Sequence, residues 1–277
     1  MDKELYLKCE IAVNEMRKDA LKMALAGKNE GAHLGGGLSM IEIMAVLYIA
    51  IMKIDVKKPK MEERDRFILS KGHGVLALYA ALKQVGFIRD EELNSFKANQ
   101  TFLYGHPSMN LNKGIEFSSG SLGQGLSLGV GTCLALKAKK NQTARAFVLL
   151  GDGECDEGSV WEAAASAAHY QLNNLVAIID KNNLQYDGLT EQVLNMNSLT
   201  DKFKAFGWNV KEVDGHNIED LYDALIDYSS KPLVIIANTV KGKGISFMEN
   251  KREWHHSRLT QKQYDEAMAE LEYRNHD

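Results

Sequence analysis

The chain has 277 residues, of which 45% are hydrophobic, which is enough for one large α/β domain or two small ones. Its formal net charge of −4 includes no long block of one sign, so we expect no nucleic-acid-binding surface. No apolar run approaches the roughly 18 residues that span a membrane, no signal-peptide pattern opens the chain, and the three cysteines have no paired or metal-ligand spacing, so we expect a protein of the reducing cytoplasm.

The first third of the chain predicts three helices and one strand. Residues 5–26 have the apolar spacing of a helix. Residues 39–52 begin with Ser-Met-Ile-Glu, the pattern of a capping box, and predict a second helix. Residues 66–69 predict a short strand, and residues 75–85 predict the helix that follows it.

The middle of the chain predicts a βαβ unit. Residues 144–150 and 175–180 are almost entirely apolar, as in buried parallel strands, and an alanine-rich helix is predicted between them over residues 157–170. The crossover between such strands is expected to be right-handed. A third buried strand is predicted over residues 233–239, and an amphipathic helix over residues 263–273.

Each predicted strand is followed by polar or glycine residues, which include His73, Asp152, Asn182 and Lys241. This recurrence is typical of a parallel sheet with one functional edge, because ligands of open α/β sheets bind at the carboxyl ends of the strands. We therefore expect an α/β fold with a parallel sheet and helices on both faces. We expect Lys241 and Lys243 to be solvated loop lysines, with anion binding as the alternative.

Asp152 and Asn182 end two strands that the βαβ unit places side by side. One carboxylate, one amide oxygen and a backbone carbonyl suit Mg²⁺ that is completed by phosphate oxygens. The glycines that flank Asp152 permit a sharp turn and a close approach of an anion to the N–H of Gly153. The alternative is an ordinary strand-to-helix turn in which Asp152 caps the helix.

At this point the sequence resembles a known family. The segments GDGECDEG, WEAAASAAHY and NLVAIIDKNNLQYDG are similar to the thiamine diphosphate motif of transketolases. The resemblance continues, in family order, through GAHLGGGLSMIEI, DRFILSKGHGVLALYAAL, LYGHPSMNLNKGIEFSSGSLGQGLSLGVG, VDGHN and TVKGKGISFMENKREWHH. It covers nearly the whole chain, and it implies one thiamine diphosphate-binding domain over residues 1–277.

The resemblance implies a cofactor site that holds thiamine diphosphate and Mg²⁺, with Ca²⁺ or Mn²⁺ as substitutes. Asp152, Asn182 and the Leu184 carbonyl would ligate the metal, and Gly153 N–H and His73 would contact the diphosphate. The cofactor's ring system would lie against the loop that contains Gly120 and Leu122.

Several histidines follow turns or glycine-rich loops. Ketol transfer needs imidazoles that bind sugar hydroxyls and move protons near neutral pH. By resemblance, His33 and His106 would bind oxygens of the donor sugar, and His255 would reach both cofactor and substrate, with His256 as its rival. The remaining three are expected to be structural or solvated: His169, His216 and His276.

Three further features keep two interpretations each. The resemblance places Glu157 at an interface through which two active sites communicate, whereas its position in a first helical turn also suits the helix dipole. The small residues of LSLGVGTCLALKAKK suit either a buried helix or a subunit interface. Cys155, in the cofactor loop, is either oxidation-sensitive or an ordinary small residue.

Single-chain transketolases are longer than this sequence, and their second half carries the glutamate that protonates the cofactor's aminopyrimidine. The resemblance therefore implies a split transketolase, in which this chain is the diphosphate-binding subunit, a partner carries the glutamate, and two copies of each assemble. It would act on sugar phosphates, with pentose phosphates as default donors. Leu34 follows the first histidine where many transketolases have proline, which leans toward deoxyxylulose-phosphate synthase and leaves a specialised sugar or sulfosugar open.

The alternatives are that synthase, a 2-oxo-acid dehydrogenase subunit, and a non-catalytic protein that binds Mg²⁺ and diphosphate. A piece of a longer enzyme is a further alternative, although the start at Met1 and the polar residues 274–277 favour natural ends.

Overall fold

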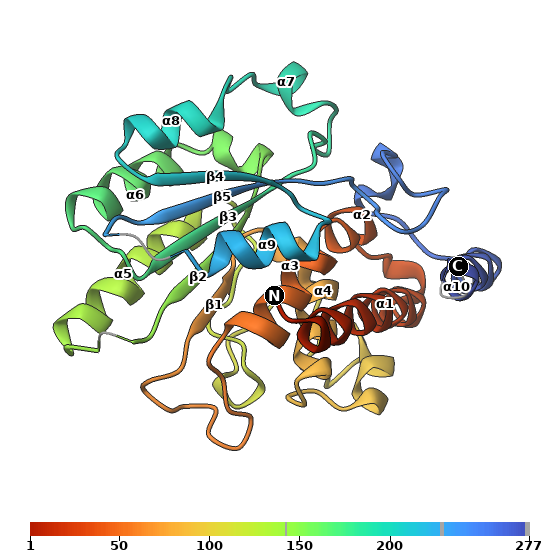
Figure 1. Cartoon of the computed structure of the whole chain (residues 1–277). Helices are drawn as coiled ribbons and strands as arrows, with labels where there is room; N and C mark the ends of the chain where they lie inside the picture. Colours follow the sequence, from red (N-terminus) through yellow and green to blue (C-terminus); the bar gives the residue numbers. More distant parts are fainter. Residues whose placement is uncertain (142, 228–229, 275–277) are drawn as a thin grey trace.

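Five parallel strands form one sheet at the centre of the molecule (Figure 1). The structure is a computed structural model that describes residues 1–141, 143–227 and 230–274. The strand order is β1-β2-β3-β5-β4, and every neighbouring pair is parallel. The strands are β1 (Arg66–Leu69), β2 (Ala146–Gly151), β3 (Leu175–Lys181), β4 (Asn209–Asp214) and β5 (Leu233–Asn238).

Helices cover both faces of the sheet (Figure 1). The side chains of β2 alternate, so that Phe147 and Leu149 belong to one apolar core and Val148 and Leu150 to the other. The first core is completed by α1 (Lys3–Ala26), α2 (Leu34–Leu38), α3 (Ile41–Ala45), α4 (Val75–Gln84), α9 (Ile218–Leu225) and α10 (Gln261–Arg274). The second is completed by α5 (Gln124–Ala138), α6 (Gly158–His169) and α8 (Leu199–Ala205), whereas α7 (Thr190–Val193) lies outside both. The predicted α/β fold, with a parallel sheet and helices on both faces, is confirmed.

The four strands predicted from sequence are present within two residues of their expected ends, but β4 was missed. β4 lies at the edge of the sheet, beside β5, and its side chains are half-buried or exposed. The polar sequence NVKEVD therefore lacks the continuous apolar run that marks the central strands.

The capping box predicted at Ser39 is wrong. The helix predicted over residues 39–52 is present as α3 and a π-helical segment over Val46–Ile51, and α3 follows Met40 without a side-chain cap; Ser39 lies just after the last residue of α2. Ser39 Oγ instead donates to Asp180 Oδ2 at 2.6 Å, because this fully buried carboxylate needs donors. Glu42, the other half of the predicted box, binds Arg17 and His216.

Helix α5 packs tightly on the sheet through two glycines. A Cβ built on Gly125 would lie 2.3 Å from Ser70 Cβ, and one on Gly129 would lie 2.5 Å from Val148 Cγ2. On the outer side, Gly131 faces open space and Ala135 is exposed. The small residues therefore serve helix–sheet packing, and some of them are also exposed on the outer side of the helix. Within the described ranges, no helix is long and apolar enough to cross a membrane.

Candidate functional site

The loops that follow β1, β2, β3 and β5 meet at the carboxyl edge of the sheet. Asp152 follows β2, and both of its carboxylate oxygens are engaged: Oδ1 accepts from Gly153 N at 2.9 Å, and Oδ2 accepts from Asn183 N at 2.7 Å and Thr190 Oγ1 at 3.1 Å. The loop after β3 therefore binds this carboxylate, and the predicted βαβ unit brings the residues that follow β2 and β3 to the same edge of the sheet.

The oxygen atoms of Asp152, Asn182 and the Leu184 carbonyl are of the kind that ligates a divalent cation. Asp152 and Asn182 are both buried, and Asp152 forms no ion pair with any described residue. Burial, and then the negative charge of Asp180, raise the pKa of Asp152. A bound cation would relieve this unfavourable charge, and a carboxylate, an amide oxygen and a carbonyl oxygen are donors that Mg²⁺ accepts.

Lys241 is not the solvated lysine predicted from sequence. Its side chain is 2% exposed, and Nζ lies 2.6 Å from the Leu184 carbonyl oxygen and 2.9 Å from Nδ1 of His255. The carbonyl expected to bind the metal thus already accepts from a lysine, and its second lone pair remains for another partner. Burial, and then the charge of Lys71, lower the pKa of Lys241 to about 8. Lys243, two residues on, is about one-third exposed and faces Glu249.

Gly153 has no room for a side chain. A Cβ on Gly153 would lie 2.5 Å from Cγ of Gln185, whose Nε2 donates to Asp156 Oδ2 at 2.7 Å. In this structure the Gly153 N–H bonds to Asp152, and Gln185 lies against the glycine. An anion at Gly153 therefore requires the N–H to exchange partners.

Five histidines converge beside this edge. The ring of His33 lies at the centre, and the centroid distances from it are 5.3 Å to His73, 5.7 Å to His106, 5.6 Å to His255 and 4.5 Å to His256. Their positions in the sequence span more than two hundred residues, so the fold alone brings them together.

The two candidates for the late histidine lie in different places. The ring of His255 is stacked on His73 at 5.2 Å, meets Tyr186 edge-on at 5.2 Å and contacts Lys241. The ring of His256 adjoins His33 and lies near Gly31, at the outer side of the cluster. His255 is therefore the one that Lys241 connects to the loop after β3, which contains Leu184.

The histidines are neutral at pH 7. Burial, followed by the neighbouring imidazoles, lowers the pKa of His33 to about 3. Burial, followed by Lys241 and Lys71, lowers the pKa of His255 to about 4. Burial is also the first cause that lowers the pKa of His73 and of His106. A neutral imidazole has one donor and one acceptor nitrogen, so each can bind a hydroxyl or accept a proton.

A buried network of hydrogen bonds around Asp180 lies near the histidines, and it was not predicted from the sequence. Asp180, at the end of β3, accepts from Lys71, Ser39 and Thr239. Lys71 Nζ also donates to the Gly36 carbonyl at 2.7 Å, which connects the loop after β1 to the middle of α2. The signal was present, because a charged residue at the end of an apolar strand needs a partner.

Glu154 forms a second buried node. Its carboxylate accepts from the Ser70 hydroxyl, from Gly123 N at 2.8 Å and from Gly151 N at 3.1 Å. One side chain thus joins the loops after β1 and β2 to the turn before α5. Burial raises the pKa of Glu154, and the three donors oppose that effect.

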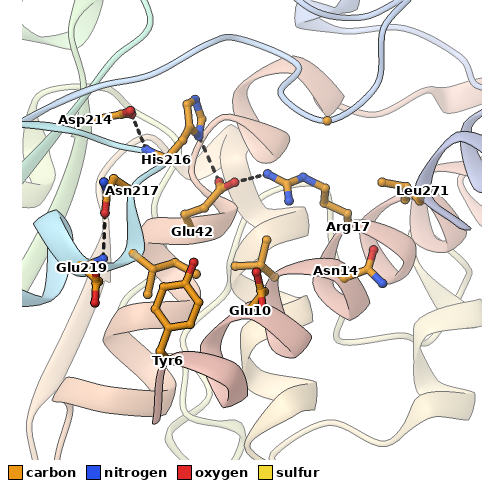
Figure 2. A pocket seen from close by; sticks show the side chains of 13 residues that line it. Tyr6, Glu10, Asn14, Arg17, Glu42, Asp214, His216, Asn217, Glu219 and Leu271 are labelled. Carbon is orange, nitrogen blue, oxygen red and sulfur yellow. Dashed lines mark hydrogen bonds and ion pairs between the residues drawn. The ribbon is translucent and has the colours of Figure 1, made fainter. Parts of the chain in front are cut away.

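A polar cavity of about 510 Å³ opens on the other side of the Lys241 loop (Figure 2). Glu42 lies at its centre and is paired with Arg17, and its Oε2 lies 3.1 Å from Nδ1 of His216. His216 Nε2 accepts from Val240 N at 2.8 Å, so this histidine has the structural role expected of it. His169 is exposed at the end of α6, and His276 lies outside the described residues.

The remaining predicted positions lie on or near the surface. Gly120 adjoins His106, Leu122 is 37% exposed, and Glu157 is exposed just before α6.

Cys155, a residue with two interpretations in the sequence, is fully buried, and burial raises the pKa of its thiol well above the usual value. This favours the interpretation of Cys155 as an ordinary small residue, because a buried thiol has little thiolate.

Comparisons with known proteins agree with the fold. Residues 10–277 match the family described as "Transketolase, thiamine diphosphate binding domain". The chain is 45% identical over 250 residues to one subunit of the apulose-4-phosphate transketolase of Phocaeicola vulgatus, covering 89% of this chain and 88% of that protein. It is 42% identical over 262 residues to 6-deoxy-6-sulfo-D-fructose transketolase subunit SqwG of a Clostridium species, covering 94% of each.

Among solved structures, transketolase from Leishmania mexicana is similar, with a TM-score of 0.86 and 28% identity. The match covers 95% of this chain and 41% of that one, so the chain spans about two-fifths of the solved transketolase.

Proposed function

The chain belongs to the transketolase family, and we propose that it is the diphosphate- and metal-binding subunit of a transketolase completed by a second chain. The observation that supports this most directly is the cluster of five neutral histidines beside the buried Asp152 and Asn182. In this proposal the enzyme transfers a two-carbon ketol unit from a ketose to an aldose, and residues 1–277 form one thiamine diphosphate-binding domain.

The cofactor is held at the carboxyl edge of the sheet. Asp152, Asn182 and the Leu184 carbonyl ligate Mg²⁺, for which Ca²⁺ or Mn²⁺ can substitute. His73 and the N–H of Gly153 bind the diphosphate, and Gly120 and Leu122 lie against the rings. When bound, thiamine diphosphate supplies the carbanion chemistry that cleaves the ketose.

The chain's own contribution is to bind the sugar and to move protons. His33 and His106 bind hydroxyl and carbonyl oxygens of the donor, and His255 serves both cofactor and substrate. Because their pKa values are lowered, these imidazoles are neutral at rest, and each can offer a hydrogen bond to a sugar oxygen.

The partner carries the glutamate that completes the cofactor chemistry, in an assembly of two copies of each chain. The exposed apolar residues after β3 are Tyr186, Leu189, Val193 and Leu194. Together with the exposed Gly131 and Ala135 of α5 and the exposed Glu157, they suit a surface that a second chain covers. Relatives of about the same length are named as subunits, which supports this division.

The donor is a ketose that carries an anionic group. One relative is named for a sugar phosphate and another for a sulfosugar, so pentose phosphates are one member of a wider class. The family match favours ketol transfer over the synthase, dehydrogenase and binding-only alternatives. The three cysteines are free and buried, which suits the reducing cytoplasm.

The test is to purify the tagged chain from its own host with Mg²⁺ and thiamine diphosphate, and to assay ketose cleavage with an aldose acceptor. We expect a second chain to co-purify and activity to require both chains. Asp152→Asn should abolish metal-dependent cofactor binding by calorimetry, whereas Asp201→Asn, in the first turn of α8, should not. Activity of the chain alone would contradict the proposed division into two subunits. Inactivity of the two chains together towards every anionic ketose would contradict the proposed ketol transfer.

A further inference from the structure

We propose that Lys241 is a positioning residue that fixes the tautomer and orientation of His255. It also ties that ring to the loop after β3, through the Leu184 carbonyl. The proposal rests on the proposed function only in assuming that His255 acts on the substrate.

The hydrogen-bond geometry determines where the proton of His255 lies. Lys241 Nζ is 2.9 Å from His255 Nδ1 and 2.6 Å from the Leu184 carbonyl oxygen. A lysine ammonium has three donors and no acceptor, so the Nδ1 atom of His255 must accept. The ring proton is therefore on Nε2, and the imidazole presents an N–H donor on the side away from the lysine.

The lysine can hold the ring because its own stem is held. Lys241 is buried, and its side chain packs against Gly35, where a Cβ would lie 3.0 Å from Cγ of the lysine. On the backbone, Gly242 N donates to the Gly35 carbonyl at 3.0 Å, and Asn250 N donates to the Lys241 carbonyl at 2.8 Å.

A second layer of contacts supports the loop from the cavity side. His216 Nε2 accepts from Val240 N at 2.8 Å, and Arg17 Nε donates to the Lys243 carbonyl at 3.3 Å. Both of these side chains bind Glu42 (Figure 2), so one buried carboxylate braces the residues on either side of Lys241. The order of support is thus from Glu42 to the loop, from the loop to Lys241, and from Lys241 to His255.

Lys241 determines which nitrogen of the His255 ring can donate a hydrogen bond to the substrate. Stacking on His73 fixes the plane of the His255 ring, but it does not choose between the two nitrogens. The lysine makes that choice. Without it the ring can flip or change tautomer, and Nε2 no longer presents a fixed donor.

The experiment uses the whole chain labelled with ¹⁵N-histidine, in which His255→Asn assigns the resonance among the eight histidines. We compare Lys241→Met, which keeps the apolar stem and removes the donor, with Lys243→Met, an identical change at a partly exposed lysine of the same loop. Long-range ¹H–¹⁵N spectra should show a protonated Nε2 and an unprotonated, hydrogen-bonded Nδ1 in the wild type. The Nδ1 resonance should move in Lys241→Met and stay unchanged in Lys243→Met.

A proton on Nδ1 in the wild type, or an Nδ1 resonance that is the same in both variants, would overturn the proposal whatever the enzyme does. If Lys241→Met does not fold, Lys241→Gln gives the same comparison with a shorter, uncharged side chain. With the partner chain present, Lys241→Met should lower kcat at least about tenfold, a part of what one acid–base group contributes. A wild-type pair without activity would instead contradict the proposed function and leave the tautomer result standing.

Discussion

Replacement of Lys71 by methionine tests whether the buried charge network sets the stability of the site. The Lys71 side chain is 2% exposed and pairs with Asp180, which is fully buried. The substitution retains the apolar stem and leaves the carboxylate with only the Ser39 and Thr239 hydroxyls as side-chain donors. Removal of one partner of a buried ion pair costs about 3–5 kcal/mol, a large part of a typical total stability of about 5–15 kcal/mol.

The matched control is Lys181→Met, at the residue next to Asp180. Lys181 pairs with Glu212 at 3.6 Å, and the side chains are 33% and 46% exposed. Such a solvent-exposed pair contributes less than about 1 kcal/mol, because water screens both charges. Urea unfolding followed by circular dichroism should therefore separate the two variants by at least about 2 kcal/mol.

The destabilisation caused by Lys71→Met should also depend on pH, in a direction that follows from the pKa of Asp180. Burial acts to raise the pKa of Asp180, but Lys71 and the donated hydrogen bonds outweigh it and lower the pKa. A carboxyl with a lowered folded-state pKa stabilises the wild type above its unfolded pKa, and this contribution is lost as the pH falls through the folded value. In Lys71→Met we expect burial to dominate and to raise the folded pKa instead. The carboxyl then takes up a proton as the pH falls, so the cost of the substitution should shrink between about pH 8 and about pH 4. Equal costs for Lys71→Met and Lys181→Met, or a cost that does not change with pH, would refute the reasoning.

Three further predictions concern single positions around the site. Glu154→Gln should cost about 1–3 kcal/mol by urea unfolding, because the amide N–H₂ replaces one of two carboxylate oxygens, each of which accepts from a glycine N–H group. Gly125→Ala should destabilise the chain because the new Cβ meets Ser70, whereas Gly131→Ala, on the open side of α5, should stabilise it by about 0.5–1 kcal/mol; equal effects would contradict the packing of α5. Cys155 should react with iodoacetamide only after unfolding, and rapid labelling of the folded chain, measured by mass spectrometry, would contradict its burial.

The central fold was predictable because its strands are long apolar runs. Residues 144–150 and 175–180 are apolar at nearly every position, since helices cover both sides of the sheet. The edge strand β4 was not predictable in the same way, because its residues are partly solvated and its sequence has no strong periodicity. Local rules failed where tertiary partners intervened. Ser39 has the sequence context of a helix cap, but Asp180 competes for its hydroxyl and lies 141 positions away.

The sequence predicted which residues belong to the candidate site, but it did not predict how they are arranged in space. Histidines in glycine-rich loops suggest catalysis, but only the fold shows that His33 and His255 lie 5.6 Å apart. The resemblance supplied the roles of these residues, which remain predictions. Lys241 was misjudged, because most loop lysines are solvated and nothing local distinguishes one that will be buried.

The buried charges explain why a site made of loops can hold a fixed geometry. The backbone beyond β1, β2, β3 and β5 leaves the hydrogen-bond ladder of the sheet, so its polar groups need other partners. Glu154 accepts from the backbone N–H of two glycines, while Lys71 and Lys241 donate to the carbonyls of Gly36 and Leu184. Each of these side chains is costly to desolvate, and each joins segments that lie far apart in the sequence. A network of uncharged side chains would cost less to bury, but it would hold the loops through weaker bonds, and the reacting groups would then be less accurately placed.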